Sequence, residues 1–133
     1  MIQVYLVEHR SEKIEDSLKI IGFFSSLVNA KAIVGYYQKS VLGFCEDPNG
    51  FRILSCNLST VKNSFSSKVF LLISWKQDGE SESEIKYEGV YASYICAFLS
   101  MLKKMVRSPF CKSTIEVFKV NHPEWKEGFI RKE

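Results

Sequence analysis

Val4-Tyr5-Leu6-Val7 opens a pattern that decides the fold, because the chain contains this pattern twice. In the first copy it is followed by Ile20-Ile21-Gly22-Phe23-Phe24-Ser25-Ser26. In the second copy Val69-Phe70-Leu71-Leu72 is followed by Ile85-Lys86-Tyr87-Glu88-Gly89-Val90-Tyr91-Ala92-Ser93. The copies are offset by 65 residues at the first run and by 67 at the glycine, which requires only a change in loop length. A duplicated unit of this size predicts two similar halves related by a pseudo-twofold axis.

Each copy has the pattern of two strands, a helix and a third strand. Apolar runs rich in β-formers predict strands, and apolar residues at i, i+3 and i+4 predict helices. The strands are expected at residues 2–9, 18–24 and 51–58, and again at 68–75, 85–92 and 115–120. The helices are expected between Ser26 and Gly43 and over Tyr94–Arg107. The predicted fold class is therefore α+β, with two tandem ββαβ units forming one antiparallel or mixed sheet that two helices cover.

The domain organisation follows from the length and from the repeat. A chain of 133 residues suffices for one hydrophobic core, so we expect a single compact domain over residues 1–133. It contains two repeats, at about 1–58 and 68–121, which a polar connector at 59–67 joins. A tail over 122–133 follows the second repeat.

Composition and charge restrict the setting and the partners. The hydrophobic content of 46% is typical of a globular protein, and a net charge of +3 does not indicate a nucleic-acid partner. The longest apolar-rich stretch, residues 91–106, includes two lysines and two serines, so we expect no membrane span. No secretory signal opens the sequence, and the four cysteines have no C-x-x-C spacing. A cytoplasmic protein with reduced cysteines is expected.

Glu8-His9-Arg10, at the end of the first strand, is the cluster closest to a catalytic pattern. A histidine near a carboxylate can act as a general base, and an arginine can hold an anion. Neighbouring strand residues point to opposite faces, however, so Glu8 and His9 are poorly placed to cooperate. We therefore expect no catalytic residue, no metal ion and no cofactor. A ligand pocket around these three residues remains the alternative.

Two charged segments of the second copy are candidates for contact with a protein partner. The acidic segment consists of Asp78, Glu80, Glu82 and Glu84, with Glu88 close to it. The basic segment consists of Lys103, Lys104, Arg107 and Lys112. Solvated surface is the other interpretation of each, and the acidic segment lacks the ligand spacing of a calcium loop.

The helix over Tyr94–Arg107 carries more apolar surface than one sheet can bury. Its main stripe consists of Tyr94, Ala97, Phe98, Met101, Leu102 and Met105, and further apolar residues lie off this stripe. Such a helix packs on a second side, against either the other helix of this chain or another protein, including a second copy. Trp125 in the tail either folds back on the domain or anchors a partner.

Residues 2–58 resemble a family of small bacterial and phage domains of uncharacterised function. The resemblance rests on Val4-Tyr5-Leu6-Val7-Glu8-His9, on Ile21-Gly22-Phe23-Phe24-Ser25-Ser26 with Ala30 and Ile33, and on Gly50-Phe51-Arg52-Ile53. The second half looks like a degenerate copy that lacks the Glu-His pair. The resemblance implies a fold unit and transfers no catalytic residue, because the family has no established activity.

The sequence favours a non-catalytic protein-binding protein over an enzyme. The expected class is a bacterial immunity protein that neutralises a cognate toxin domain by occluding its active site. One alternative is a small-ligand sensor or enzyme with a pocket around His9 and Arg10. Another is a homodimeric structural accessory protein that associates through the helix at 94–107.

Overall fold

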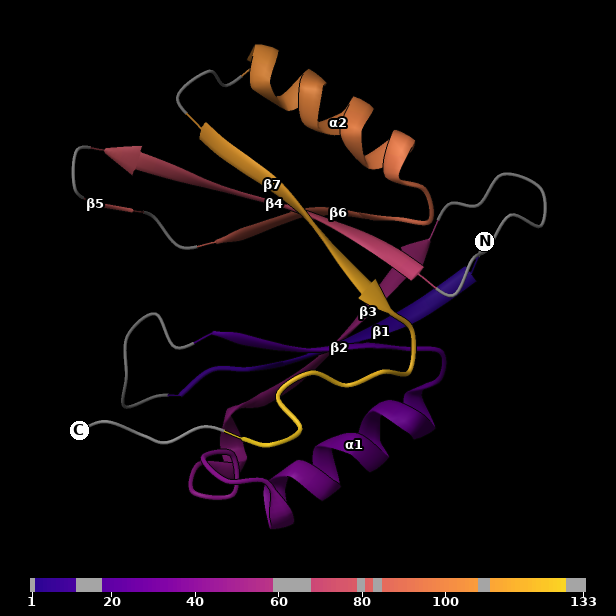
Figure 1. Ribbon diagram of the computed structural model, residues 1–133, viewed down its shortest axis with the longest axis vertical. Coiled ribbons are helices and arrows are strands. Elements are labelled where there is room, and N and C mark those ends of the chain that lie inside the picture. Colours follow the sequence, from indigo (N-terminus) through magenta and orange to yellow (C-terminus); the bar gives the residue numbers. More distant parts are fainter. Residues whose placement is uncertain are drawn as a thin grey trace. The chain divides into compact units, whose positions relative to one another are not determined.

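The computed structural model describes residues 2–11, 18–58, 68–78, 81–82, 85–107 and 111–128. The chain is α+β, with two helices and two antiparallel sheets in this part (Figure 1). It divides into two compact units. The first unit comprises Gln3–Cys56 and Lys119–Glu133, and the second comprises Met1–Ile2 and Asn57–Phe118.

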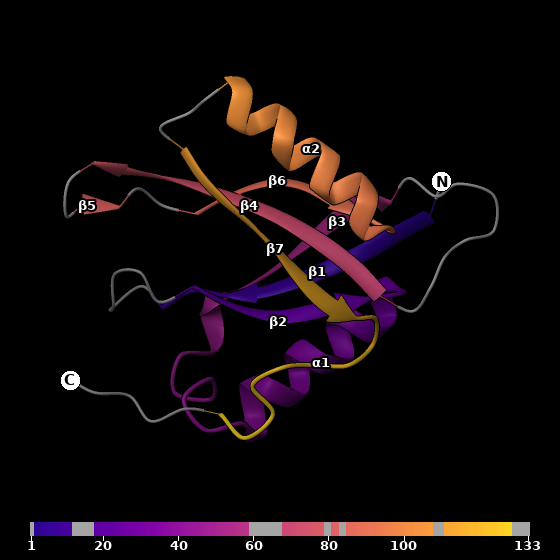
Figure 2. The ribbon, with the colours of Figure 1, turned by 45° about the horizontal axis from the view of Figure 1, so that its top comes forward.

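The first unit contains a three-stranded sheet with one helix across a face (Figure 2). Its elements are β1 (Ile2–His9), β2 (Lys19–Phe24), α1 (Leu27–Ser40), the 3₁₀ turn η1 (Pro48–Gly50) and β3 (Phe51–Leu58), with strand order β2-β1-β3. The Ser26 side chain caps α1 by accepting a hydrogen bond from the Asn29 amide at 3.1 Å. Between helix and sheet lies a core of Val7, Ile21, Phe24, Ala30, Tyr37, Val41 and Phe44. The sequence prediction of a capped helix on this sheet is confirmed.

The second unit repeats this order. Its elements are β4 (Lys68–Asp78), β5 (Ser81–Glu82), β6 (Lys86–Tyr91), α2 (Tyr94–Arg107) and β7 (Cys111–Lys119). The central strand β4 pairs with β6 and with β7, as β1 pairs with β2 and β3 in the first unit. The short strand β5 lies in a segment predicted as loop, and α2 has the predicted bounds.

Both hairpins carry a bulge beside a glycine at the same place. The pairing of β1 with β2 shifts register after Gly22 and skips Ile21. The pairing of β4 with β6 shifts register after Gly89 and skips Glu88. A bulge inserts one extra residue into one strand of a pair, so Ile21 and Glu88 occupy equivalent positions. Residues of β2 and β6 that are 67 apart in the sequence therefore occupy equivalent places in the two hairpins.

The prediction of one sheet under two helices is wrong, because each unit forms its own sheet. Hydrogen bonding among the described strands stays within each ββαβ unit. The last strand also begins at Cys111, four residues earlier than expected.

The tail returns to the first unit and covers the edge of β2. The Asn121 amide donates to the Phe23 carbonyl at 2.8 Å, and the Glu124 amide donates to the Ile21 carbonyl at 2.7 Å. The Tyr37 hydroxyl donates to the Glu124 carbonyl at 2.6 Å. A segment more than sixty residues beyond β3 thus completes the hydrogen bonding of an edge strand.

Candidate functional site

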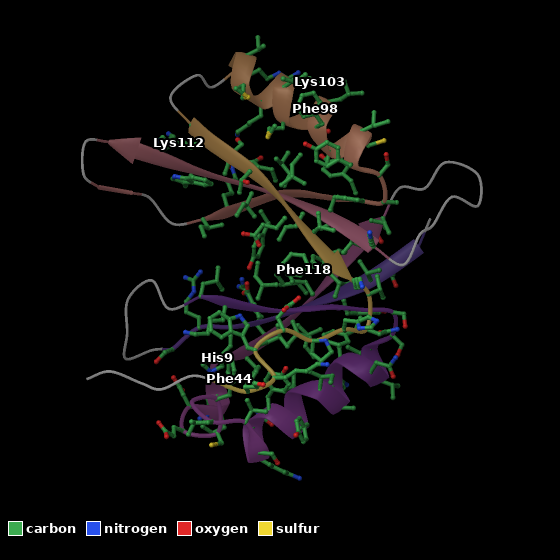
Figure 3. All side chains as sticks on the ribbon, in the orientation of Figure 1. His9, Phe44, Phe98, Lys103, Lys112 and Phe118 are labelled. Atoms are coloured by element: carbon green, nitrogen blue, oxygen red, sulfur yellow. The ribbon has the colours of Figure 1, made fainter. Side chains whose placement is uncertain are left out.

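A cavity of about 330 Å³ lies between α2 and the strands β4 and β6 of the second unit. Its lining consists of Leu72, Glu88, Tyr91, Ser100, Lys103, Lys104 and Arg107. Four of the residues that the sequence singled out for partner contact, Glu88 and the three cations of α2, come together here. Lys112, on β7, is exposed and is not part of this lining (Figure 3).

Two of the lining residues, Glu88 and Lys104, form a polar cluster with Ser74. The Ser74 hydroxyl donates a hydrogen bond to Glu88 Oε1 at 2.6 Å. Lys104 Nζ lies 3.2 Å from the same oxygen. Ser74 comes from β4, Glu88 from the bulge of β6 and Lys104 from α2, so the cluster joins helix to sheet.

The first unit shows what these three positions hold in a filled core. With offsets of 65 on the first strand and 67 after the bulge, the cluster corresponds to His9, Ile21 and Tyr37. All three are at most 1% exposed, and Ile21 and Tyr37 belong to the core cluster of the first unit. At the positions where the first unit has three buried side chains, the second unit therefore has a serine, a carboxylate and an ammonium group.

The remaining lining follows the same correspondence. Leu72, Tyr91 and Ser100 correspond to Val7, Phe24 and Ile33, which lie in or against the core of the first unit. The cavity thus occupies the place where the first unit packs its helix on its sheet. The same helix–sheet position is filled by buried side chains in the first unit and is lined mainly by polar and charged side chains in the second.

The cluster keeps Glu88 ionised. The hydrogen bond from Ser74 lowers the pKa of the Glu88 carboxyl, and the hydrogen bond and positive charge of Lys104 act in the same direction. Burial opposes this shift but does not cancel it. The negative charge at the wall of the cavity is therefore balanced by Lys104.

Two further cations line the cavity without such a balance. Within the described part of the chain, no carboxylate pairs with Lys103 or Arg107. The three cations and one carboxylate of the lining leave a net charge of +2. Lys104 and Arg107 lie in the last turn of α2, where cations interact favourably with the helix dipole. The dipole corresponds to about half an elementary charge, so the cavity remains positive.

The outer face of α2 is apolar and exposed. Tyr94, Ile95, Phe98, Leu99, Leu102, Met105 and Val106 have exposed fractions of 37–84%. Figure 3 shows Phe98 and Lys103 on this helix. Four of these residues, Ile95, Leu99, Leu102 and Val106, follow the 4-3-4 spacing of a helix–helix seam.

The stripe from Tyr94 to Met105 is buried only in part, because Met101 is half-buried whereas Tyr94, Phe98, Leu102 and Met105 are exposed. Ala97 is the fully buried residue of α2, and Ser100 and Lys104 are the half-buried polar residues beside it. The ion pair of Lys104 with Glu88 joins this edge of the helix to the sheet, and the Tyr94 ring lies 6.0 Å from that of Phe70 on β4. The helix has two distinct surfaces, a charged one over the cavity and an apolar one outside.

His9 is a core residue of the first unit. Its side chain is 1% exposed and lies against the rings of Phe44 and Phe51, with centroids 5.0 and 4.6 Å away (Figure 3). Its Nε2 donates to the carbonyl oxygen of Asp47 at 2.9 Å. A Cβ at Gly50 would lie 2.7 Å from that nitrogen, so the backbone closes over the ring. This packing gives a ligand no path to His9.

Glu8 and Arg10 make contacts of their own. Arg52 Nε donates to Glu8 Oε1 at 2.6 Å, and the Arg10 amide donates to the Gly50 carbonyl at 2.9 Å. Glu8 is buried whereas Arg10 is exposed. The three residues of the pocket alternative therefore point to different surroundings, as expected for neighbours on a strand.

The other predicted contact residues fall outside this site or outside the described residues. Glu80 and Glu84 lie outside the described residues, as do the side chains of Asp78 and Glu82. Trp125 belongs to the tail, where Lys19 Nζ lies 5.5 Å from its ring centroid. The tail folds back on the first unit, so Trp125 packs at least partly within the chain.

Sequence reasoning missed Ser74, Leu72, Tyr91 and Ser100 as parts of a site. The signal was present in the repeat: aligning the copies places Glu88 opposite Ile21 and Lys104 opposite Tyr37. Glu88 and Lys104 carry opposite charges, whereas the first copy has an apolar and an aromatic residue at these two positions. Such a pair of differences indicates a polar site between helix and sheet.

Comparison with protein-family models, with curated proteins and with solved structures gives no match. Among the described helices, neither is long and apolar enough to cross a membrane. All four cysteines are free thiols, and the described residues contain no group of three side chains suited to a metal ion.

Proposed function

We propose that this chain is a protein-binding protein that docks a helical partner on the outer face of α2. The observation that carries the proposal is the exposed seam of Ile95, Leu99, Leu102 and Val106. Exposed apolar residues at this spacing are the anchors of helix-in-groove and helix–helix recognition. Contiguous apolar surface of this kind is rare on a monomer and marks interaction sites.

The charges beside the seam favour a partner with acidic residues. Lys103 follows Leu102 directly and lies on the cationic flank of the helix, together with Arg107. Cations at such flanking positions select acidic side chains on the opposite helix. The partner is therefore expected to present an apolar ridge bordered by Asp or Glu.

A second copy of this chain is the runner-up occupant. In an antiparallel pair of α2 helices, the cationic last turn of one would meet the first turn of the other, which contains no acidic residue. In a parallel pair, cations would meet cations. Neither arrangement neutralises Lys103 and Arg107, so charge favours a different protein over a homodimer.

Within the protein-binding class, the immunity protein remains our preferred version. Such a protein occludes the active site of a toxin domain through shape and charge, and a rigid helix with an apolar face suits that task. We also propose that the two units descend from one duplicated ββαβ ancestor. The matching strand order and bulges support the duplication.

The test compares two variants with matched exposure. Ile95→Gln with Val106→Gln changes residues of the seam, and Val28→Gln with Tyr36→Gln changes residues of α1 that are 59–77% exposed. Burial of an aliphatic side chain contributes about 1.5–3 kcal/mol, so the seam variant should weaken partner binding roughly 100-fold. The α1 variant should bind like the wild type.

Affinity capture from the native host supplies the partner, which is then purified and titrated against each variant. A stoichiometric partner that is lost with the seam variant and kept with the α1 variant supports the proposal. Equal binding of both variants contradicts it. Concentration-dependent dimerisation in sedimentation velocity that the seam variant abolishes would establish the homodimer instead. Inhibition of a toxin activity of the captured partner decides the immunity version.

A further inference from the structure

We propose that the cavity beneath α2 is a binding site for a single oxyanionic group, a carboxylate or a phosphate. The site is separate from the apolar seam, because its lining includes none of the four seam residues, but Lys103 and Arg107 belong both to this lining and to the flank of the seam. The anion titration below uses no protein partner, so its failure and the failure of the docking proposal are distinguishable.

The charge of the cavity is the first step of the argument. Glu88 is held by Ser74 and Lys104, so its charge is neutralised within the wall. Lys103 and Arg107 add two cations to the same lining. A site with this surplus attracts anions, and the guanidinium of Arg107 can bind an oxyanion through two parallel hydrogen bonds.

The size and the hydroxyl groups form the second step. A volume of about 330 Å³ lies at the lower end of the range of ligand pockets, about 300–1,000 Å³, which suits a small group. Ser100 and Tyr91 place hydroxyl-bearing side chains on the lining. Hydroxyl groups, like ammonium groups, can donate hydrogen bonds to an oxyanion.

The comparison with the first unit forms the third step. At the two positions that carry the ion pair, the first unit has Ile21 and Tyr37, both buried. At the rim, where the second unit has Lys103 and Arg107, the first has Tyr36 and Ser40. The second unit thus has both the cavity and the cations, whereas the first unit has a filled core and lacks these cations.

The charge of Glu88 gives a prediction with a definite sign. Its carboxylate repels an incoming anion and occupies Lys104. Glu88→Gln removes the repulsion and frees the ammonium group, so it should tighten anion binding about tenfold. Loss of Lys103 and Arg107 should weaken binding by at least about tenfold.

The experiment is an NMR titration of the ¹⁵N-labelled full chain at constant ionic strength. Inorganic phosphate and acetate are the two probes. Saturable shifts confined to the amides of residues 72, 88, 91 and 100–107 support the site. Binding of phosphate alone assigns it to phosphate-bearing ligands, whereas binding of acetate as well assigns it to carboxylates, such as an acidic side chain of a protein.

Three variants complete the test. Lys103→Gln with Arg107→Gln changes exposed residues and should abolish saturation, and Glu88→Gln should lower the Kd. Lys31→Gln with Lys39→Gln removes two cations from α1 as a matched control and should leave the Kd unchanged. The proposal is overturned if neither probe gives saturable shifts, if the control weakens binding as much as the site variant, or if Glu88→Gln weakens it.

Discussion

Replacing the polar cluster of the second unit by apolar side chains should stabilise this unit. The variant is Ser74→Val with Glu88→Ile and Lys104→Leu, which replaces the polar cluster by apolar side chains. The reasoning is that the backbone of this unit is built for an apolar core, as the equivalent positions of the first unit show. Replacing a buried ion pair by well-packed apolar residues is often neutral or stabilising.

The magnitude follows from the burial of the cluster. Full burial of an isoleucine or leucine contributes about 1.5–3 kcal/mol. The side chains of Glu88 and Lys104 are 17% and 26% exposed, so about four-fifths of this is realised, or about 3.5 kcal/mol for both. The lost hydrogen bond to a charged group costs about 1.5–3 kcal/mol and the lost ion pair about 0–1 kcal/mol. The triple variant should therefore be about 1 kcal/mol more stable.

The single variants should change stability in the opposite direction. Glu88→Ile alone leaves the Ser74 hydroxyl and the Lys104 ammonium group without their acceptor. Lys104→Leu alone leaves the Glu88 charge with one hydrogen bond. Each should destabilise the unit by about 1–2 kcal/mol.

Urea unfolding monitored by tryptophan fluorescence measures both effects. Trp75 lies on β4 of the second unit and Trp125 in the tail of the first, and the chain has two tryptophans. Replacing either one by Phe therefore leaves a reporter of the other unit. If the triple variant loses as much free energy of unfolding as the single variants do in sum, the backbone of the second unit does not accommodate an apolar core at these positions, and the reasoning is refuted.

Two further predictions concern titratable groups. Burial, with the negative charge of Glu124, raises the pKa of Tyr37 to about 12, so the stability from its neutral form is complete below pH 10 and is lost as the pH rises towards 12. Tyr37→Phe should cost about 1 kcal/mol at pH 7, and this difference should shrink above pH 10 in urea unfolding; a constant difference contradicts the assignment. The lowered pKa of Glu88 means that its contribution to stability is complete above pH 4.5 and is lost as the pH falls through the lowered value. Ser74→Ala should raise this pKa towards 4.5 in a ¹³C NMR titration of the Glu88 carboxyl, and an unchanged pKa would show that Ser74 is not the main cause.

The sequence predicted the elements better than the way they pack. Apolar periodicity, with a serine directly before each helix, was enough to predict both helices, because such signals act locally. The repeat aligned Gly22 with Gly89, and both lie at register shifts. Each of these features is determined within about ten residues of the chain.

The rotation of α2 about its axis was not predictable from its own sequence. A helix with an apolar arc this wide can turn several faces to a sheet, and periodicity does not choose among them. The choice is made by Glu88 on another element, whose carboxylate holds Lys104 against the sheet. The number of sheets was missed for a related reason, since alternation along a strand does not state which strands lie beside it.

The tail that covers β2 has a consequence for synthesis on the ribosome. The Ser25 backbone amide donates a hydrogen bond to Asn121 Oδ1 at 3.0 Å, across 96 residues of sequence. At about 5–20 residues per second, the ribosome needs roughly 5–20 s to make the intervening segment. During that interval the edge of β2 has no tail to pair with, although its hairpin and α1 have already been translated. Residues 121–124 therefore pair with β2 only after the strand itself has formed. A nascent chain that lacks residue 121 would leave the backbone groups at the edge of β2 unpaired and able to bind a strand of another molecule.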